Sequence, residues 1–213
     1  LTINGDLALN NVTNVVELGS DPFTIGGNVN DLVAVNGSVN LSGLNTIKIV
    51  PVAPLSAATP YIIVNAFAVN GIAANLQVTS DNPRYTLSVL DPTTTPGQIQ
   101  ISVTGNPTPL VWKGGKAPNP VAWDHTVTNW LNTGTAQFDK FFDGDLVTFD
   151  DSAVTNLVSV NETNIAGLAI FTNNALNYTL TGGGAIGGTF VKDGSGTVTF
   201  AFSNPTALGL SYL

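Results

Sequence analysis

The sequence predicts an all-β protein whose short strands stack into a solenoid. Runs of β-branched and aromatic residues return at near-regular intervals, most clearly within residues 177–205, and Gly, Ser and Asn separate them. No stretch has convincing helical periodicity. The glycines at 182–184, 187–188, 194 and 196 fit solenoid corners, because glycine adopts positive φ without a Cβ penalty.

The first half of the chain alternates strand-like runs with Gly, Pro and Asp breakers. These runs are residues 1–3, 6–10, 15–18, 23–25, 31–35, 38–41, 46–50, 61–67, 85–90 and 98–103. Residues 65–75 come closest to a helix, but Gly71 and the β-branched residues limit it to a turn or two. If one circuit of the solenoid, here called a rung, takes roughly 20 to 25 residues, the whole chain forms about nine rungs.

A short Pro-rich segment, residues 105–109, predicts a boundary between a module of residues 1–104 and a second module of residues 105–213. The composition changes after this segment. All three Trp residues follow it, and so do five Asp residues between positions 139 and 151. From residue 154 onward the chain resumes the rhythm of strands and glycines.

Composition limits the possible partners. The formal net charge is −8, and only six residues are Lys or Arg, which are too few for a phosphate-binding stripe. Binding to nucleic acid or to anionic membranes is therefore not expected. The chain has no Cys, so it has neither disulfides nor thiolate metal sites. The missing initiator Met suggests a processed or excised segment.

The acidic cluster is the best candidate for a metal site. Asp143, Asp145, Asp150 and Asp151 could gather oxygen ligands for Ca²⁺, which takes six to eight of them. The alternative is that Asp143 and Gly144 form a tight turn, while Asp150 and Asp151 end a strand in solvent. No other cofactor is expected.

The Trp residues offer a second possibility for binding. Trp112, Trp123 and Trp130 could stack on the sugar rings of a cell-surface glycan, or they could fill the core of a small β module. Paired carboxylates next to them would suit a glycosidase. However, His125 is the only His, and no nucleophile motif surrounds it. We therefore predict no enzymatic activity and no catalytic residues.

The ends of the sequence suggest self-association. Strand-like residues reach both termini without a charged or Pro-rich cap, and the terminal rungs of a solenoid leave unpaired N–H and C=O groups. Copies are therefore expected to join end to end. The residues predicted to form this contact are Leu1, Thr2, Ile3, Leu208, Leu210, Tyr212 and Leu213.

Asn residues at the expected turns fit the same architecture. Asn tolerates the left-handed conformation of a corner, and stacked Asn side chains can hydrogen-bond from rung to rung. Examples are Asn11, Asn28, Asn36 and Asn40.

The second half carries a resemblance to a known family. The segments LVWKGG, AWDHTVTNWLN, FFDGDLVTFDD and GGGAIGGTFVKDGSGTVTF resemble the autotransporter-associated β-strand repeat of large bacterial surface and secreted proteins. This resemblance implies a right-handed parallel β-helix at the cell surface or outside the cell. The chain departs from the family pattern in lacking the usual aromatic-Thr-Gly ending of the repeat.

We therefore expect a non-catalytic, extracellular structural solenoid. It would be a building block of a bacterial surface appendage, filament, sheath or large adhesin, and its main partner would be itself. The alternatives are a glycan- or calcium-binding adhesion module and, third, a polysaccharide-active β-helix enzyme.

Overall fold

The computed structural model describes residues 1–203 and the short strand at 211–212. It confirms the all-β class, since one 3-10 turn, η1 (Ala73–Asn75), is the only helix among the described residues. The chain divides into two compact units, Leu1–Asn106 and Pro107–Leu213, here called unit 1 and unit 2. This division lies inside the Pro-rich segment at which the sequence predicts a boundary. No helix within the described part is long and apolar enough to cross a membrane.

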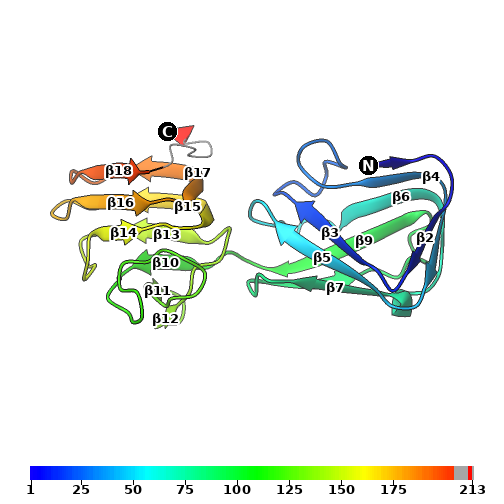
Figure 1. The fold of residues 1–213 in the computed structure, drawn as a ribbon, viewed down its shortest axis with the longest axis horizontal. Helices are drawn as coiled ribbons and strands as arrows, with labels where there is room; N and C mark the ends of the chain where they lie inside the picture. The colour runs from blue at the N-terminus through cyan, green and yellow to red at the C-terminus, as the bar shows by residue number, and fades with distance from the viewer. Residues whose placement is uncertain (204–210, 213) are drawn as a thin grey trace. The chain divides into compact units, whose positions relative to one another are not determined.

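Unit 1 consists of two sheets whose early strands run parallel (Figure 1). One sheet has the order β1-β4-β6-β9-β8, with β2 also paired to β4, and the other has the order β3-β5-β7. The strands are β1 (Thr2–Ile3), β2 (Leu7–Asn10), β3 (Thr13–Leu18), β4 (Val33–Ser42), β5 (Asn45–Pro51), β6 (Tyr61–Asn70), β7 (Leu76–Ser80), β8 (Tyr85–Val89) and β9 (Gln98–Gly105).

The pairing arranges the parallel strands of unit 1 in three successive layers, and from here on a rung means one such layer of strands. They are β1, β2 and β3, then β4 and β5, then β6 and β7. Each rung is long, because the pairing places Thr13 beside Thr46 and Asn40 beside Asn70. After the third rung, β9 pairs antiparallel with β6 and with β8, so the parallel stack ends there.

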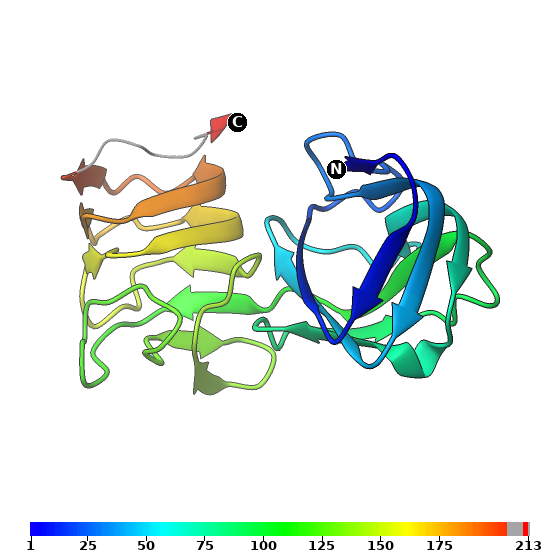
Figure 2. The same ribbon diagram turned by 45° about the vertical axis from the view of Figure 1, so that its right-hand side comes forward.

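Unit 2 also stacks its strands in parallel (Figure 1). Its strands are β10 (Pro109–Trp112), β11 (Trp130–Asn132), β12 (Gln137–Asp139), β13 (Leu146–Phe149), β14 (Leu157–Ser159), β15 (Thr163–Phe171), β16 (Tyr178–Gly182), β17 (Ala185–Lys192), β18 (Val198–Phe202) and β19 (Ser211–Tyr212). From β13 to β19 the rungs are shorter than those of unit 1, since the pairing places Leu146 beside Leu168 and Tyr178 beside Val198. Figure 2 shows this stack from a second direction.

An insertion closes the early end of this stack. Leu110 pairs with Val147, far along the chain, because the antiparallel strands β11 and β12 lie between β10 and β13 in the sequence. β11 pairs with the edge of β10 that faces away from β13. Antiparallel strands therefore end the parallel stack on this side.

These registers correct three sequence expectations. The uniform stack of about nine rungs is wrong, because unit 1 uses longer rungs than unit 2 and antiparallel strands interrupt the parallel order. The expected strand at 23–25 is absent; Phe23 instead lies in the connection between β3 and β4. The runs at 31–35 and 38–41 form the single strand β4, whose register shifts between Val35 and Ser38.

Gly and Asn show the predicted backbone and side-chain chemistry, but several of them lie within strands and not at corners; Gly188 lies within β17, where the pairing with β15 shifts register. Gly188 has φ of 108°, and a Cβ there would lie 1.8 Å from the carbonyl oxygen of Ala166 in the preceding rung. Asn11 adopts positive φ, and the amide of Asn36 donates to the side chain of Asn4 one rung earlier at 2.7 Å. The amide of Asn70 likewise donates to Asn40 at 2.8 Å.

The two units have different cores. Unit 1 buries mainly Val, Leu and Ile with two Tyr residues, whereas unit 2 buries a cluster of aromatic rings. In unit 2, Phe149 and Phe171 are register partners whose rings stack with centroids 4.6 Å apart. Such ring pairs contribute beyond the area that they bury.

Candidate functional site

The first rung of unit 1 has open strand edges. β1 and β3 are the last strands of their sheets, and β2 pairs only with β4 among the described strands. An exposed edge presents unpaired main-chain groups and is a template for another strand. β1 and β2 carry no charge, and β3 carries only Glu17.

The hydrogen bonds around β3 identify which of its main-chain groups face outward. The carbonyl of Leu18 accepts from Val52 N at 2.9 Å, on the β5 side. On the other side, the N–H of Glu17 donates to the Asp31 carboxylate at 2.9 Å, and its carbonyl accepts from Asp31 N at 2.8 Å. Because bonding directions alternate along a strand, the main-chain groups of Thr13 and Val15 also face the outer edge.

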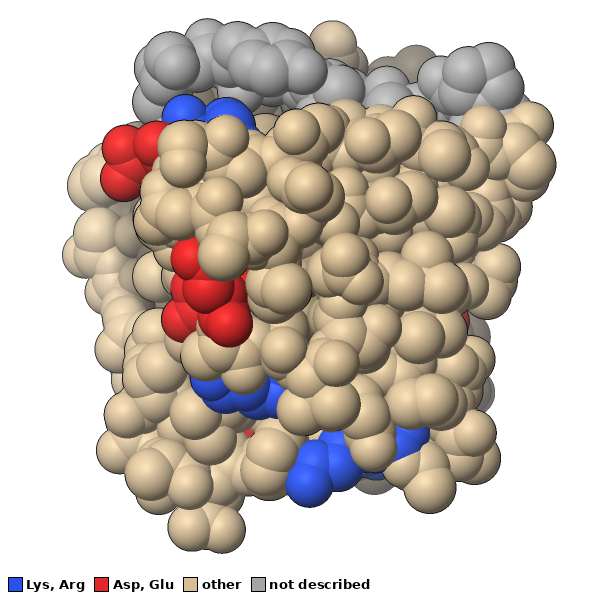
Figure 3. All heavy atoms as spheres, turned by 90° about the vertical axis from the view of Figure 1, so that its left-hand side faces the viewer, with Lys and Arg blue, Asp and Glu red and all other residues tan. Residues whose placement is uncertain are grey.

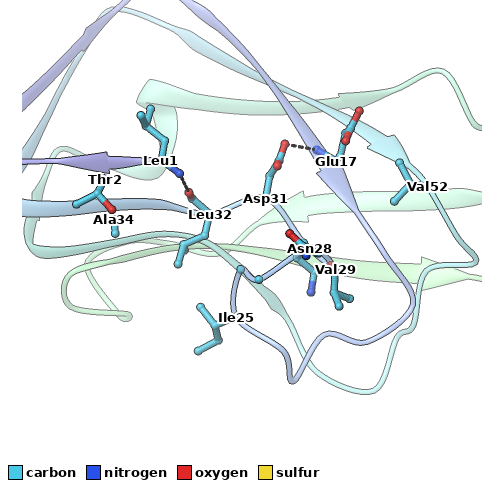
Figure 4. A pocket seen from close by; sticks show the side chains of 13 residues that line it. Leu1, Thr2, Glu17, Ile25, Asn28, Val29, Asp31, Leu32, Ala34 and Val52 are labelled. Atoms are coloured by element: carbon cyan, nitrogen blue, oxygen red, sulfur yellow. Dashed lines mark hydrogen bonds between the residues drawn. The ribbon is translucent and has the colours of Figure 1, made fainter.

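The connection between β3 and β4 folds over one end of this rung and leaves a pocket of about 600 Å³ (Figure 4). Two contacts hold its rim. Asp31 accepts from Glu17 as above, and the main-chain nitrogen of Leu1 donates to Leu32 O at 2.9 Å. The pocket is lined by Leu1, Thr2, Glu17, Ile25, Gly26, Gly27, Asn28, Val29, Asn30, Asp31, Leu32, Ala34 and Val52.

A second cavity, of about 360 Å³, reaches from this rung toward the core of unit 1. It shares Leu1, Asp31 and Leu32 with the first pocket and extends to Val16 and Ile63, which are otherwise buried. The stack therefore has an opening at its first rung through which core side chains can be reached.

Apolar side chains surround this opening. Leu1 is 81% exposed, Val15 61% and Ile25 50%. The only charged residues before Lys48 are four acids: Asp6, Glu17, Asp21 and Asp31. Clustered apolar exposure next to an open strand edge is typical of a protein contact surface.

No family model, curated protein or solved structure matches this chain. The resemblance to the autotransporter-associated repeat therefore gains no support from these comparisons. The assignment of function depends on the geometry of the chain itself.

The predicted self-association residues fall into two groups. Thr2 and Ile3 form β1, which pairs with Ala34 and Val35 on one side only. Tyr212 lies in β19, where its main chain pairs with Phe190. Leu208, Leu210 and Leu213 lie outside the described residues.

A polar cluster in unit 2 involves residues that the sequence did not connect. His125 Nδ1 lies 2.5 Å from Glu162 Oε1, and its Nε2 lies 3.2 Å from Asp143 Oδ1. The main-chain nitrogen of His125 also donates to Glu162 at 2.9 Å. Asp143 in turn accepts from Ile165 N at 2.8 Å. The cluster thus links three segments of the first rungs of unit 2.

This environment favours the imidazolium form. The hydrogen bond with Asp143 raises the pKa of His125 to about 9, burial opposes the rise, and the charge of Asp143 and the contact with Glu162 add to it. Near neutral pH both ring nitrogens donate to carboxylates, so the imidazolium cross-links Asp143 and Glu162. It has no free lone pair for a metal or for general-base catalysis. No sequence pattern signals this cluster, because the insertion sets the spacing between His125 and Glu162.

The four carboxylates predicted as calcium ligands bind the main chain of neighbouring loops. Asp145 is fully buried and accepts from Thr108 N at 2.8 Å and from Phe142 N at 3.0 Å. Asp143 belongs to the His125 cluster.

The other two hold a second loop. Asp150 accepts from Ser152 N at 2.9 Å. Asp151 accepts from the main-chain nitrogens of Asn174, Ala175 and Leu176, and these bonds lower its pKa. Within the described residues no group of three or more His, Asp or Glu side chains is arranged to hold a metal ion. Calcium binding stays a prediction.

The predicted glycan contacts are wrong. Trp112, Trp123 and Trp130 are all fully buried, so none offers a ring face to a sugar. Trp130 packs edge-on against both of the others, with centroids 5.0 Å and 5.4 Å apart. The dense aromatic spacing that suggested a binding platform instead forms the core where the insertion closes the stack.

One face of unit 2, shown in Figure 3, carries few charges, and small acidic and basic groups interrupt a largely uncharged surface there. The outward positions of β16 and β18 include Thr179, Thr181 and Thr199. Neutral polar side chains therefore keep this face in contact with water.

Proposed function

We propose that each unit is a short right-handed parallel β-helix and that the chain is a non-catalytic structural module that associates with copies of itself. The observation that carries this proposal is the open first rung of unit 1. There an uncharged strand edge, exposed apolar side chains and an opening to the core occur together.

The position of the antiparallel strands supports this reading. β8 and β9 end the stack of unit 1 after its third rung, and β11 and β12 end the stack of unit 2 before its first rung. Charged residues, proline or covering strands usually protect sheet edges against association. β1, β2 and the first half of β3 have none of these protections among the described residues.

The bacterial cell surface or the extracellular space is the proposed location. This part of the proposal depends on the family resemblance and on a composition in which only 9% of residues are charged. A surface appendage, filament, sheath or large adhesin would use such a module for length and durability. The glycan-binding alternative is weakened, because the three Trp residues proposed to contact sugar are buried.

Electron microscopy of the 213-residue chain, concentrated at neutral pH, tests the proposal. We expect filaments or regular oligomers built from 22.0 kDa subunits. Single particles at every concentration, with a sedimentation coefficient that stays that of a monomer, would contradict it.

A further inference from the structure

In unit 2, β18 also has an edge that is open among the described strands. β18 pairs with β16 on one side, and no described strand pairs with its other side. Its sequence, VTFAF, has neither charge nor proline. Phe200 contacts the rings of Phe171 and Phe190 yet stays 36% exposed. A cavity of about 230 Å³ lies beside it.

Hydrogen bonding within the stacks follows one rule. At the pairs β14–β16, β16–β18 and β3–β5, the earlier strand bonds through residues whose side chains point inward, and the later strand bonds through residues whose side chains point outward. Val160 N, from a buried residue, donates to Thr181 O at 2.7 Å. Tyr178 N, also from a buried residue, donates to Thr197 O at 2.9 Å. In unit 1, the buried Leu18 accepts from Val52 N.

The two open edges are complementary under this rule. On β18, the main-chain N–H and C=O groups that bond to β16 belong to residues whose side chains point outward. The main-chain groups of the inward residues Val198, Phe200 and Phe202 therefore face the free edge. On β3, the free groups belong to the outward residues Thr13 and Val15. β18 can therefore act as the earlier strand and β3 as the later one.

We propose that β18 of one copy pairs in parallel with β3 of another copy, so that copies join head to tail. This inference rests on the proposed self-association and specifies its geometry. In the register that places Thr13 and Val15 between the three free positions of β18, Ala201 lies opposite Val15 and Phe200 opposite Asn14. Because each copy has one β3 and one β18, the contact is heterologous, so repeated pairing links copies into a closed ring or an open chain.

The apolar surfaces agree with this arrangement. The exposed ring of Phe200 comes to lie over the inward face of β3, next to Val16 and the cavity that reaches Ile63. The pairing would cover the cavities at both open rungs. Within each stack, the next rung covers the inward side chains of the rung before it in the same way. Main-chain hydrogen bonds supply affinity and the alternating side chains supply register, as in other strand additions.

Engineered cysteines in the full chain test the inference, and the natural chain contributes no Cys of its own. Val15→Cys and Ala201→Cys place thiols at outward positions predicted to be opposite one another. Neighbouring strands about 5 Å apart permit a disulfide. The control is Val15→Cys with Thr181→Cys, since Thr181 is the register partner of Ala201 one strand further in.

After mild oxidation, the Val15→Cys/Ala201→Cys chain should form a ladder of dimers, trimers and larger species on a non-reducing gel. The control should give at least about tenfold less disulfide-linked product, because its two thiols would lie about 10 Å apart, across two strand spacings. Each single-cysteine variant should run as a monomer on the same denaturing gel, because its association is not covalent.

Two results would overturn the head-to-tail geometry and leave the proposed function standing. One is a disulfide dimer from a single-cysteine variant alone, which would mean that like ends meet. The other is association of the wild-type chain by sedimentation with no ladder from the double variant. If the wild-type chain does not associate at all, both proposals fail.

Discussion

The two units use the same stacked-strand architecture but stabilise it by different means. Unit 1 has the longer rungs and packs aliphatic side chains inside them, whereas unit 2 has shorter rungs around stacked rings. The difference shows that strand pattern alone leaves the size of a rung undetermined. Both units also hold their connections with buried polar side chains, among them Asn45 in unit 1 and Asp145 in unit 2.

The buried polar groups of unit 1 illustrate this point. The Tyr61 hydroxyl donates to Gly19 O at 2.9 Å and accepts from Ser56 N at 2.8 Å. The amide of the buried Asn45 donates to Ser42 O at 3.1 Å and to Asn75 O at 3.2 Å, which joins two rungs. The longer rungs of unit 1 thus depend on satisfied hydrogen bonds.

The largest expected effect is on the aromatic core of unit 2. Trp123→Ala removes a fully buried indole and should lower the free energy of unfolding by about 3 to 5 kcal/mol. Trp123→Phe is the control. It should cost much less, because the indole N–H of Trp123 has no hydrogen-bond partner in the described structure. Urea unfolding followed by fluorescence of the two remaining Trp residues, both in unit 2, would measure this loss. Equal losses for the two variants would contradict the role given to ring packing.

The second prediction concerns the polar contacts of unit 1. Tyr61→Phe leaves the buried Gly19 carbonyl and Ser56 N–H without their partner, and should cost about 1 to 3 kcal/mol. Tyr178→Phe in unit 2 is the matched variant, because that hydroxyl donates a hydrogen bond to Asp150 O at 2.6 Å. Its cost should be smaller, about 1 kcal/mol. Urea titrations monitored by circular dichroism would compare the two, and a larger loss for Tyr178→Phe would contradict the greater contribution given to the Tyr61 hydroxyl, which has two main-chain partners.

The third prediction is a dependence on pH that is specific to unit 2. The folded state raises the pKa of His125 from 6.5 to about 9, so the stabilisation is fully present below pH 6.5 and is lost as pH rises through about 9. Since the three side chains are about one-third exposed, we expect about 1 to 2 kcal/mol after solvent screening.

The variant His125→Gln should therefore be less stable than wild type at pH 6, and the difference should vanish near pH 10. Unfolding by urea at a series of pH values, followed by Trp fluorescence, would measure it. A difference that stays constant over this range would contradict the charged cross-link.

Much of the fold could be predicted from the sequence because strand alternation and glycine corners are local. Most of the expected strands exist, and Gly188 and Asn11 adopt the predicted backbone conformations. The rung length could not be predicted, because it depends on which strands pair with one another. The length of the loops between strands does not determine that pairing. The insertion of β11 and β12 had the largest consequence. It places His125 beside Glu162 and buries the Trp residues. Neither outcome could be predicted, because antiparallel pairing of an insertion leaves no periodic signal in the sequence.

The candidate site was predicted only in part. The sequence indicated open ends, and Thr2 and Ile3 do lie on an open edge. Two exposed residues that line the opening, Val15 and Ile25, have only the pattern of ordinary strand residues in the sequence. Exposure of an edge strand depends on the connection that covers it, here residues 19–32, and the sequence does not specify that path.

Sedimentation equilibrium of three chains tests the central claim that the free edge of β3 is an association surface. Val15→Pro removes an N–H that faces the outer edge, which a strand edge tolerates, whereas Val15→Thr keeps that N–H. We predict that wild type and Val15→Thr associate with similar affinity and that Val15→Pro associates at least about tenfold more weakly, with an unchanged circular dichroism spectrum. Equal association of all three folded chains would contradict the claim.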